Sequence, residues 1–183
     1  LDELTPVLRQ RFDDGFFRQC HGDLHLRNIV RLADGITTFD CIEFSTDLQN
    51  TDVMADIAFL IMDLVAKQRV DLAAHCINLY LEVTGDYEGL RVFNLYFTYR
   101  CLVRAKVAVI RSAERQDATD RRKDLEKAQR YCAMARRQAT PKSPLLVTMN
   151  GYSGSGKTWV SGQLMAALPA IRIRSDIERK RLR

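Results

Sequence analysis

Long apolar runs and paired cysteines are missing from this sequence. It contains no stretch of about 18 consecutive apolar residues, the length that a membrane-spanning helix needs, so we expect no membrane partner. It has five cysteines, an odd number, and none forms a C-x-x-C pair, which argues against a disulfide framework or a zinc site. We therefore expect reduced thiols and a cytoplasmic protein. The 183 residues, 46% hydrophobic and 28% charged, suit one folded domain or two small ones.

The charge is unevenly distributed along the chain. The formal net charge is +5; residues 111–137 hold nine basic and five acidic side chains (9 − 5 = +4), and residues 172–183 hold six and two (6 − 2 = +4). The first segment is typical of a solvated helix. No interleaved aromatic residues or known binding module accompany the charge, so we expect no nucleic-acid partner. A nucleic-acid-associated protein that uses the basic tail is the alternative, and strongly salt-dependent oligonucleotide binding would favour it.

The most specific motif is Gly151-Tyr-Ser-Gly-Ser-Gly156-Lys157-Thr158, which fits G-x-x-x-x-G-K-[ST] at every fixed position. An apolar run at residues 145–149 precedes it, and a helix-like pattern at residues 159–168 follows. Strand, glycine loop and helix is the context that a nucleotide-binding P-loop requires. The alternative is a flexible glycine turn before a helix.

The residue types of this loop suit polyphosphate binding. Glycines let backbone N–H groups converge on phosphate oxygens, and the helix N-terminus adds partial positive charge. Lys157 can reach the β- and γ-phosphates as a catalytic cation, and the Thr158 hydroxyl can ligate Mg²⁺. We therefore predict ATP and Mg²⁺ as cofactors. The predicted nucleotide-binding residues are Gly151, Ser153, Gly154, Ser155, Gly156, Lys157 and Thr158.

Two prolines divide the chain near residues 140–144, because proline cannot continue the preceding helix. After this predicted linker, the pattern indicates a strand at 145–149, the loop, a helix and a second strand at 171–174. Before it, apolar periodicity and turn residues predict one helix, one strand, a hairpin and four longer helices. These lie at residues 5–13, 16–20, 28–32 with 36–41, 53–64, 72–83, 90–112 and 117–138.

A second candidate site follows the first predicted strand, in His21-Gly-Asp-Leu-His-Leu-Arg-Asn28. Asp23 precedes Asn28 by five positions, and Asp40 follows Asn28 by twelve, at the end of the hairpin. Protein-kinase-like phosphoryl transfer uses one carboxylate to accept the proton of the attacking hydroxyl. It uses an amide oxygen and a second carboxylate to hold Mg²⁺. Taken singly, each residue also has an ordinary reading, such as a surface acid or a strand-end cap.

The segment resembles the catalytic loop of the aminoglycoside phosphotransferase family, relatives of choline and homoserine kinases, which carry His-Gly-Asp-x-His-x-x-Asn followed by a metal-binding Asp. The resemblance implies that Asp23 is the catalytic base and that Asn28 and Asp40 are Mg²⁺ ligands. It further implies that His21 and His25 brace the loop.

The resemblance covers about residues 1–138, as the C-terminal lobe of such a kinase. The sequence departs from the family at Leu26-Arg27, where Pro-Gly is usual. No glycine-rich strand pair or strand lysine precedes residue 21, so either that lobe lies outside this chain or the unit is a degenerate kinase. Because the catalytic acids are present, we expect the first: the chain is an excerpt of a longer protein and inactive by itself. Asp56 resembles a family helix-start acid, for which we expect a structural role bonding backbone near the loop.

Other charged residues are open to two interpretations. Glu43 could contact metal or substrate, or form a structural salt bridge. Three cations of the helix at residues 90–112 could line the pocket of an anionic acceptor, or could lie on a solvated face. These cations are Arg100, Arg104 and Lys106.

The tail after residue 174 is similar to small-molecule P-loop kinases of the gluconate-kinase-like and zeta-toxin-like kinds. The resemblance implies that Asp176 and Arg179 bind the phosphate acceptor beside the γ-phosphate. The alternative is an ordinary amphipathic helix start capped by Ser175.

Together these observations predict an α+β protein-kinase-like C-lobe, mostly helical with a short β-hairpin, followed by the start of an α/β P-loop NTPase domain. The predicted bounds are residues 1–139 for the lobe, 140–144 for the linker and 145–183 for a P-loop kinase or AAA-type ATP-binding domain. The predicted function is ATP-dependent phosphoryl transfer to a small-molecule hydroxyl at two sites. The alternative is a regulatory ATPase or nucleotide sensor whose kinase-like lobe binds a ligand without chemistry.

Overall fold

The structure is a computed structural model that describes residues 2–140, 143–168 and 170–182. The chain forms two compact units, residues 1–63 with 88–141 and residues 64–87 with 142–183. Two of the predicted linker residues, 141 and 142, lie outside the described residues, and the predicted domain bounds stay a prediction.

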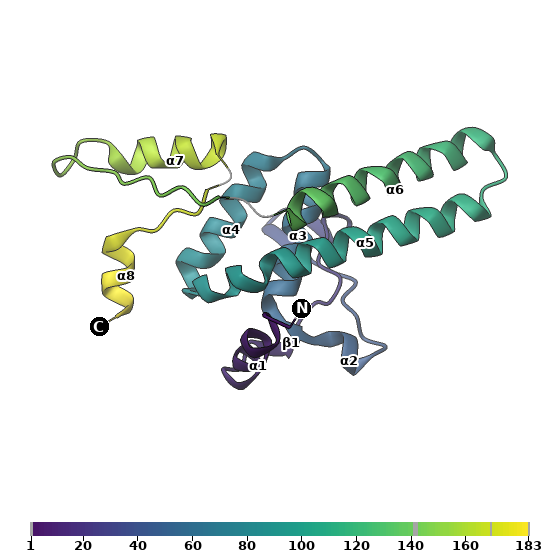
Figure 1. Cartoon of the computed structure of the whole chain (residues 1–183), viewed down its shortest axis with the longest axis horizontal. Helices are drawn as coiled ribbons and strands as arrows, with labels where there is room; N and C mark the ends of the chain where they lie inside the picture. Colours follow the sequence, from purple (N-terminus) through teal and green to yellow (C-terminus); the bar gives the residue numbers. More distant parts are fainter. Residues whose placement is uncertain (1, 141–142, 169, 183) are drawn as a thin grey trace. The chain divides into compact units, whose positions relative to one another are not determined.

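The helices and strands predicted between residues 5 and 138 are confirmed to within a few residues (Figure 1). Four short elements were not predicted from the sequence, at residues 26–28, 46–49, 50–52 and 87–89. The elements are α1 (Thr5–Asp13), β1 (Phe17–Gln19), the 3₁₀-helix η1 (Leu26–Asn28), β2 (Ile29–Leu32), β3 (Gly35–Thr38), α2 (Thr46–Gln49), β4 (Asn50–Asp52), α3 (Val53–Ala66), α4 (Val70–Thr84), the 3₁₀-helix η2 (Tyr87–Gly89), α5 (Leu90–Glu114), α6 (Ala118–Ala139), α7 (Lys157–Ala167) and α8 (Ser175–Arg181).

The first unit holds two small antiparallel sheets. β1 pairs with β4, so that Phe17 lies opposite Asp52, and β2 pairs with β3 in the predicted hairpin. The Phe39 amide donates to the carbonyl of Asn28 at 3.0 Å, which extends the hairpin contact by one residue. The hairpin therefore brings Asn28 beside Asp40, twelve residues further along the chain.

Helices supply the core of the first unit. The α3 side chains of Met54, Phe59 and Met62 are at most 1% exposed, and burying each stabilises the fold by about 1.5–3 kcal/mol. α5 and α6 lie side by side in opposite directions (Figure 1). Small buried side chains on both helices, such as Ala105 and Ala128, let them pack closely.

In the second unit, α4 ends as its sequence predicts. Gly85 adopts the left-handed conformation at φ 75°, and its amide donates to the carbonyl of Leu81 at 2.8 Å. α4 packs against α7. The buried Asn78 of α4 holds an extended segment: its Nδ2 donates to the Ala170 carbonyl at 2.9 Å, and its Oδ1 accepts from the Arg172 amide at 2.6 Å.

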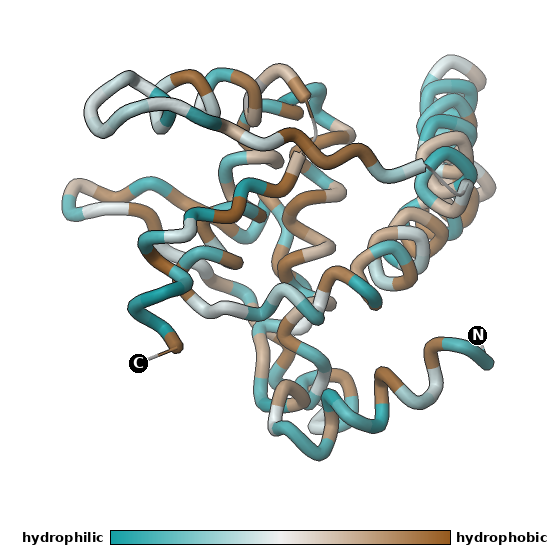
Figure 2. The backbone as a smooth tube through the Cα atoms, turned by 60° about the vertical axis from the view of Figure 1, so that its left-hand side comes forward, coloured by the Kyte–Doolittle hydropathy of each residue, from teal (hydrophilic) through white to brown (hydrophobic). Residues whose placement is uncertain are grey.

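The predicted strands at residues 145–149 and 171–174 are wrong. Both segments are extended, but within the described part of the chain neither has a hydrogen-bonded strand partner. The extended run at residues 145–149 is mostly hydrophobic (Figure 2). Its side chains are largely exposed, with Leu146 at 86%. A strand is defined by the ladder it makes with a neighbour, so apolar character alone does not produce one. Residues 145–168 therefore form a loop and a helix, and residues 170–182 form a second loop and helix.

A smaller correction concerns the start of α8. Arg174 occupies the N-cap position, and Ser175 is the first helical residue, so Ser175 does not cap the helix.

The predicted thiol state agrees with the structure. Cys20, Cys41, Cys76, Cys101 and Cys132 are free thiols. Among the described residues, none of the helices combines the length and the apolar character that crossing a bilayer requires.

Candidate functional site

Asn28 contacts the two other residues predicted for phosphoryl transfer in the first unit, Asp23 and Asp40. It is 5% exposed, and its Nδ2 donates to the Asp23 carbonyl at 3.1 Å and to Asp23 Oδ2 at 3.3 Å. The same nitrogen donates to the carbonyl of Asp40 at 3.4 Å. The loop and the end of the hairpin therefore meet at one amide.

Asp23 is fixed at one oxygen and otherwise accessible. Its side chain is 41% exposed, and Oδ2 lies 3.4 Å from Nε2 of the buried His25. His25 Nδ1 accepts from the Arg27 amide at 3.2 Å, so in the neutral tautomer Nε2 carries the hydrogen and donates to Asp23. His21 likewise accepts from the Asp23 amide and contacts the Phe39 carbonyl at 2.8 Å. Both histidines brace the loop, as the resemblance implies.

Two buried carboxylates of α3 anchor the loop by its backbone. Asp56 accepts from the amides of His21 at 2.8 Å and Gly22 at 3.1 Å, which is the structural role expected for it. Asp63, 3% exposed, accepts from the Leu26 amide at 3.0 Å. The sequence reading missed Asp63. The available signal was its i+7 spacing from Asp56 in an otherwise apolar helix, since these positions share one face.

Arg100 does not lie on a solvated helix face. Its Nη2 donates to the Gly22 carbonyl at 2.8 Å, and its guanidinium carbon lies 4.5 Å from the centroid of the Phe59 ring. Burial lowers the pKa of Arg100, against the opposing effect of Asp56. Of the two other cations considered with it, Arg104 is half-buried and Lys106 is exposed.

Asp40 and Glu43 lie on the exposed side of the loop. Asp40 adopts a left-handed backbone at φ 60°, a conformation that costs energy for a residue with a side chain and that clusters at functional sites. The exposed Glu43 accepts from the Cys41 thiol at 3.7 Å. Neither predicted role of Glu43 gains support from this contact.

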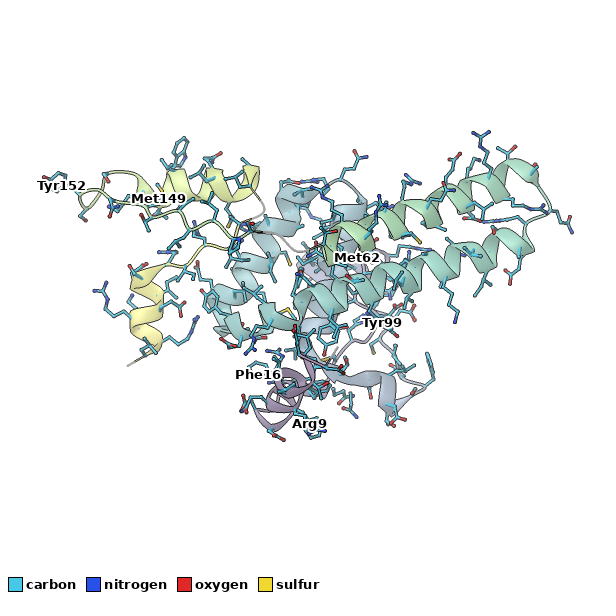
Figure 3. The ribbon with its side chains drawn as sticks, viewed as in Figure 1. Arg9, Phe16, Met62, Tyr99, Met149 and Tyr152 are labelled. Carbon is cyan, nitrogen blue, oxygen red and sulfur yellow. The ribbon has the colours of Figure 1, made fainter. Side chains whose placement is uncertain are left out.

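In the second unit, the glycine loop leads directly into α7. The helix begins at Lys157, two residues earlier than expected, which places Lys157 and Thr158 in its first turn. Gly154 and Gly156 have φ of 78° and 82°, values that glycine adopts without strain. The first amides of a helix lack intrahelical partners, so this turn directs N–H groups toward the loop. Tyr152, 91% exposed, projects from the loop (Figure 3).

Lys157 folds back over the loop. Its Nζ donates to the carbonyls of Gly151 at 2.7 Å and Tyr152 at 2.6 Å, and lies 3.4 Å from Ser155 Oγ. The ammonium group is therefore held by the backbone of its own loop. Ser153 and Thr158, two other predicted contacts, are exposed.

The two predicted acceptor residues of the tail lie on α8. Arg179 is exposed. Asp176 accepts from Arg174 Nη2 at 2.9 Å, and this hydrogen bond lowers the pKa of the exposed Asp176 carboxyl. Arg174 also lies 3.5 Å from Glu82 of α4. Acceptor binding by Asp176 and Arg179 stays a prediction.

A glycine loop that opens a helix, with a lysine and a threonine in the first turn, defines a P-loop nucleotide-binding segment. Comparison with known proteins agrees for this part of the chain: a family model described as an AAA domain matches residues 146–183. The resemblance of residues 1–138 to aminoglycoside phosphotransferases rests on the loop motif alone.

Three relatives carry the name uncharacterized protein, one from Mycobacterium bovis and two from strains of Mycobacterium tuberculosis. Each is 31% identical over 176 residues, which cover 94% of this chain and 34% of the relative. The chain thus spans about a third of the length of these relatives. No solved structure matches it.

Proposed function

We propose that this chain carries two sites of an ATP-dependent phosphotransferase that acts on small-molecule hydroxyl groups. The observation that carries the proposal is Asn28, whose side-chain amide donates to the Asp23 carboxylate and to the backbone carbonyl of Asp40. The P-loop geometry of residues 151–158 supports the ATP dependence.

Asp23 has the geometry of a general base. One carboxylate oxygen is bound by His25 and Asn28, while 41% of the side chain stays exposed to an incoming acceptor. In the proposed step, the acceptor hydroxyl gives its proton to Asp23, and its oxygen bonds to the γ-phosphorus. The bond from that phosphorus to the β,γ-bridging oxygen breaks, and ADP leaves.

The donor groups of Asn28 and Asp40 are of the kind that binds the metal such a step uses. Amide and carboxylate oxygens are the hard ligands that Mg²⁺ prefers. Mg²⁺ would neutralise phosphate charge when bound. The Asn28 amide now turns its nitrogen toward Asp23 and Asp40, so metal binding would require its oxygen to face the ion.

In the second unit, Lys157 and the first turn of α7 would bind ATP phosphates, with Thr158 as a Mg²⁺ ligand. Phosphate oxygens would replace the carbonyls of Gly151 and Tyr152 as partners of the Lys157 ammonium. Asp176 and Arg179 would contact the acceptor of this second site.

The test uses the intact natural polypeptide that contains this chain, γ-labelled ATP and a metabolite extract, followed by identification of the labelled product. Lys157→Ala first disables the P-loop site. Adding Asp23→Asn should then lower the remaining transfer by about 10²–10⁴-fold, the usual contribution of a general base. Asp34→Asn makes the same charge change in the exposed hairpin turn and is the matched control. It should leave the amount of labelled product unchanged.

Each outcome decides something. Undiminished labelling in the Asp23→Asn protein would refute the base assignment. ATP consumption without any labelled small molecule would overturn phosphotransfer and favour the regulatory ATPase.

The P-loop site has its own reporter. Trp159, the only tryptophan of the chain, lies in the first turn of α7 and is 70% exposed. Titration with ATP should change its fluorescence, and Lys157→Ala should weaken the fitted affinity about tenfold or more, which corresponds to about 1.4 kcal/mol or more. Lys180→Ala, on the exposed surface of α8, should not change it.

A further inference from the structure

The two peptide groups that flank the Gly22 Cα are bound by side chains of opposite charge. Its N–H donates to Asp56 Oδ1 at 3.1 Å, and its carbonyl accepts from Arg100 Nη2 at 2.8 Å. The residue has a φ of 78°, and a Cβ at this position would lie 2.9 Å from Ile42 Cδ1. The backbone directly before Asp23 is therefore fixed by an anion, a cation and a steric limit that favours glycine.

Arg100 and the histidine that holds Asp23 pack on the same aromatic ring. Phe59 is 1% exposed, and its ring meets the Arg100 guanidinium at 4.5 Å and the His25 ring at 5.4 Å. From this shared support, Arg100 reaches the backbone before Asp23, and His25 Nε2 reaches the carboxylate at 3.4 Å. The buried Phe59 ring thus supports both Arg100, which bonds the backbone before Asp23, and His25, which contacts the Asp23 carboxylate.

The charges that act on Arg100 include two acids of the loop region, Asp56 and Asp23. The guanidinium is largely withdrawn from water, which lowers its pKa, while the negative charges of Asp56 and Asp23 act to raise it. An arginine side chain stays charged in proteins, so a positive charge is retained under the loop. Cation–aromatic contacts gain strength when they are desolvated, as this one is.

We propose that Arg100 is a positioning residue that orients Asp23 through the Gly22 carbonyl and the Phe59 ring. This inference rests on the proposed function of Asp23 as a base. It replaces acceptor binding as the role of this cation. The two roles predict different kinetics, because a positioning residue acts on turnover and an acceptor-binding residue acts on the acceptor KM.

The experiment compares Arg100→Gln, Arg100→Lys and the control Arg91→Gln in the intact natural polypeptide with the P-loop disabled by Lys157→Ala. Arg91 lies at the start of α5, with its side chain 60% exposed. We expect Arg100→Gln to lower kcat by about a hundredfold, the loss that small misplacement of a reacting group causes, with the acceptor KM within about twofold. Arg100→Lys keeps the charge and one donor and should recover part of this loss. Arg91→Gln should match the parent protein.

A second readout does not need activity. Hydrogen exchange at the Asp23 amide, which belongs to the same peptide group as the Gly22 carbonyl, should be faster in Arg100→Gln and unchanged in Arg91→Gln. If Arg100→Gln lowers the stability of the whole first unit, the exchange of α3 amides will be faster too. In that case the inference is judged on Arg100→Lys, which keeps the charge and one donor. A raised acceptor KM with unchanged kcat, or unchanged exchange at Asp23, would overturn the inference. If every variant, including Asp23→Asn, transfers phosphate at the rate of the parent protein, the proposed function itself is overturned.

Discussion

The buried ion pair between Arg11 and Asp52 should contribute more to the stability of the first unit than any exposed pair. Arg11 donates twice to the Asp52 carboxylate, from Nε at 2.7 Å and from Nη2 at 2.8 Å. The two side chains are 3% and 0% exposed. The pair joins α1 to β4, and β4 pairs with the strand β1 that leads into the loop of Asp23.

Replacing Arg11 by Met leaves a carboxylate buried without its cation. Removing one partner of such a pair costs about 3–5 kcal/mol, which for a chain of this size lowers Tm by roughly 6–20 °C. Asp52 would retain bonds from the Met54 amide at 2.9 Å and the Tyr96 hydroxyl at 3.2 Å, so the lower half of the range is the better expectation. Burial, followed by the negative charge of Asp52, raises the pKa of Tyr96, so the hydroxyl stays a donor at neutral pH.

Urea unfolding followed by far-UV circular dichroism, with hydrogen exchange of α3 as a check, measures the effect. The matched control is Arg122→Met, which breaks the exposed Arg122–Glu126 pair at 3.0 Å and should cost less than about 1 kcal/mol. Adding Asp52→Asn to Arg11→Met removes the buried charge and should recover stability. An Arg11→Met protein as stable as the Arg122→Met control would refute the reasoning.

Three further predictions concern the surroundings of Asp23. Gly22→Ala should destabilise the first unit by about 1–3 kcal/mol in urea unfolding, because its Cβ would lie 2.9 Å from Ile42 Cδ1 at a positive φ; Gly15→Ala, with nothing near its Cβ, separates the φ cost from the clash. Asp63→Ala should speed hydrogen exchange at the Leu26 amide, and unchanged exchange would contradict an anchoring role. Burial, with Asp56 as the next cause, raises the pKa of Cys20 to about 11. Its alkylation should therefore be slow at pH 8 and rise about tenfold per pH unit toward pH 10. The exposed Cys41 should react first, and equal rates would count against the prediction.

Elements with local signals were predictable from the sequence. The turn at residues 33–35 fixes the hairpin, and Gly85 ends α4, because turn and cap chemistry depends on residues close in sequence. α2 and β4 have four and three residues, too few to show a period. The strand predicted at residues 145–149 failed for another reason: strand formation depends on a pairing partner, which no local pattern encodes.

The motif of the candidate site could be predicted from the sequence, but the residues that hold its loop in place could not. The spacing of Asp23, Asn28 and Asp40 indicated phosphoryl transfer, and the hairpin explains how Asn28 contacts both the Asp23 carboxylate and the Asp40 backbone. The anchors Asp63 and Arg100 bond loop residues 37 and 78 positions away. A single charged residue in a helix is expected to face solvent unless its partner is known. Only the tertiary structure therefore identifies Asp63 and Arg100 as anchors.

The two candidate sites are prepared for phosphate to different degrees. The backbone of the Asp23 loop is held by groups from outside it, namely Asp56 and Arg100. The P-loop is closed by its own Lys157, whose ammonium occupies the carbonyls of Gly151 and Tyr152. If the second site binds ATP as proposed, phosphate replaces existing hydrogen bonds of Lys157, and the net gain in free energy is smaller than the contact with the ligand alone would give. Nucleotide should consequently reorganise the loop before α7, while the backbone of the Asp23 loop should change little when its substrates bind.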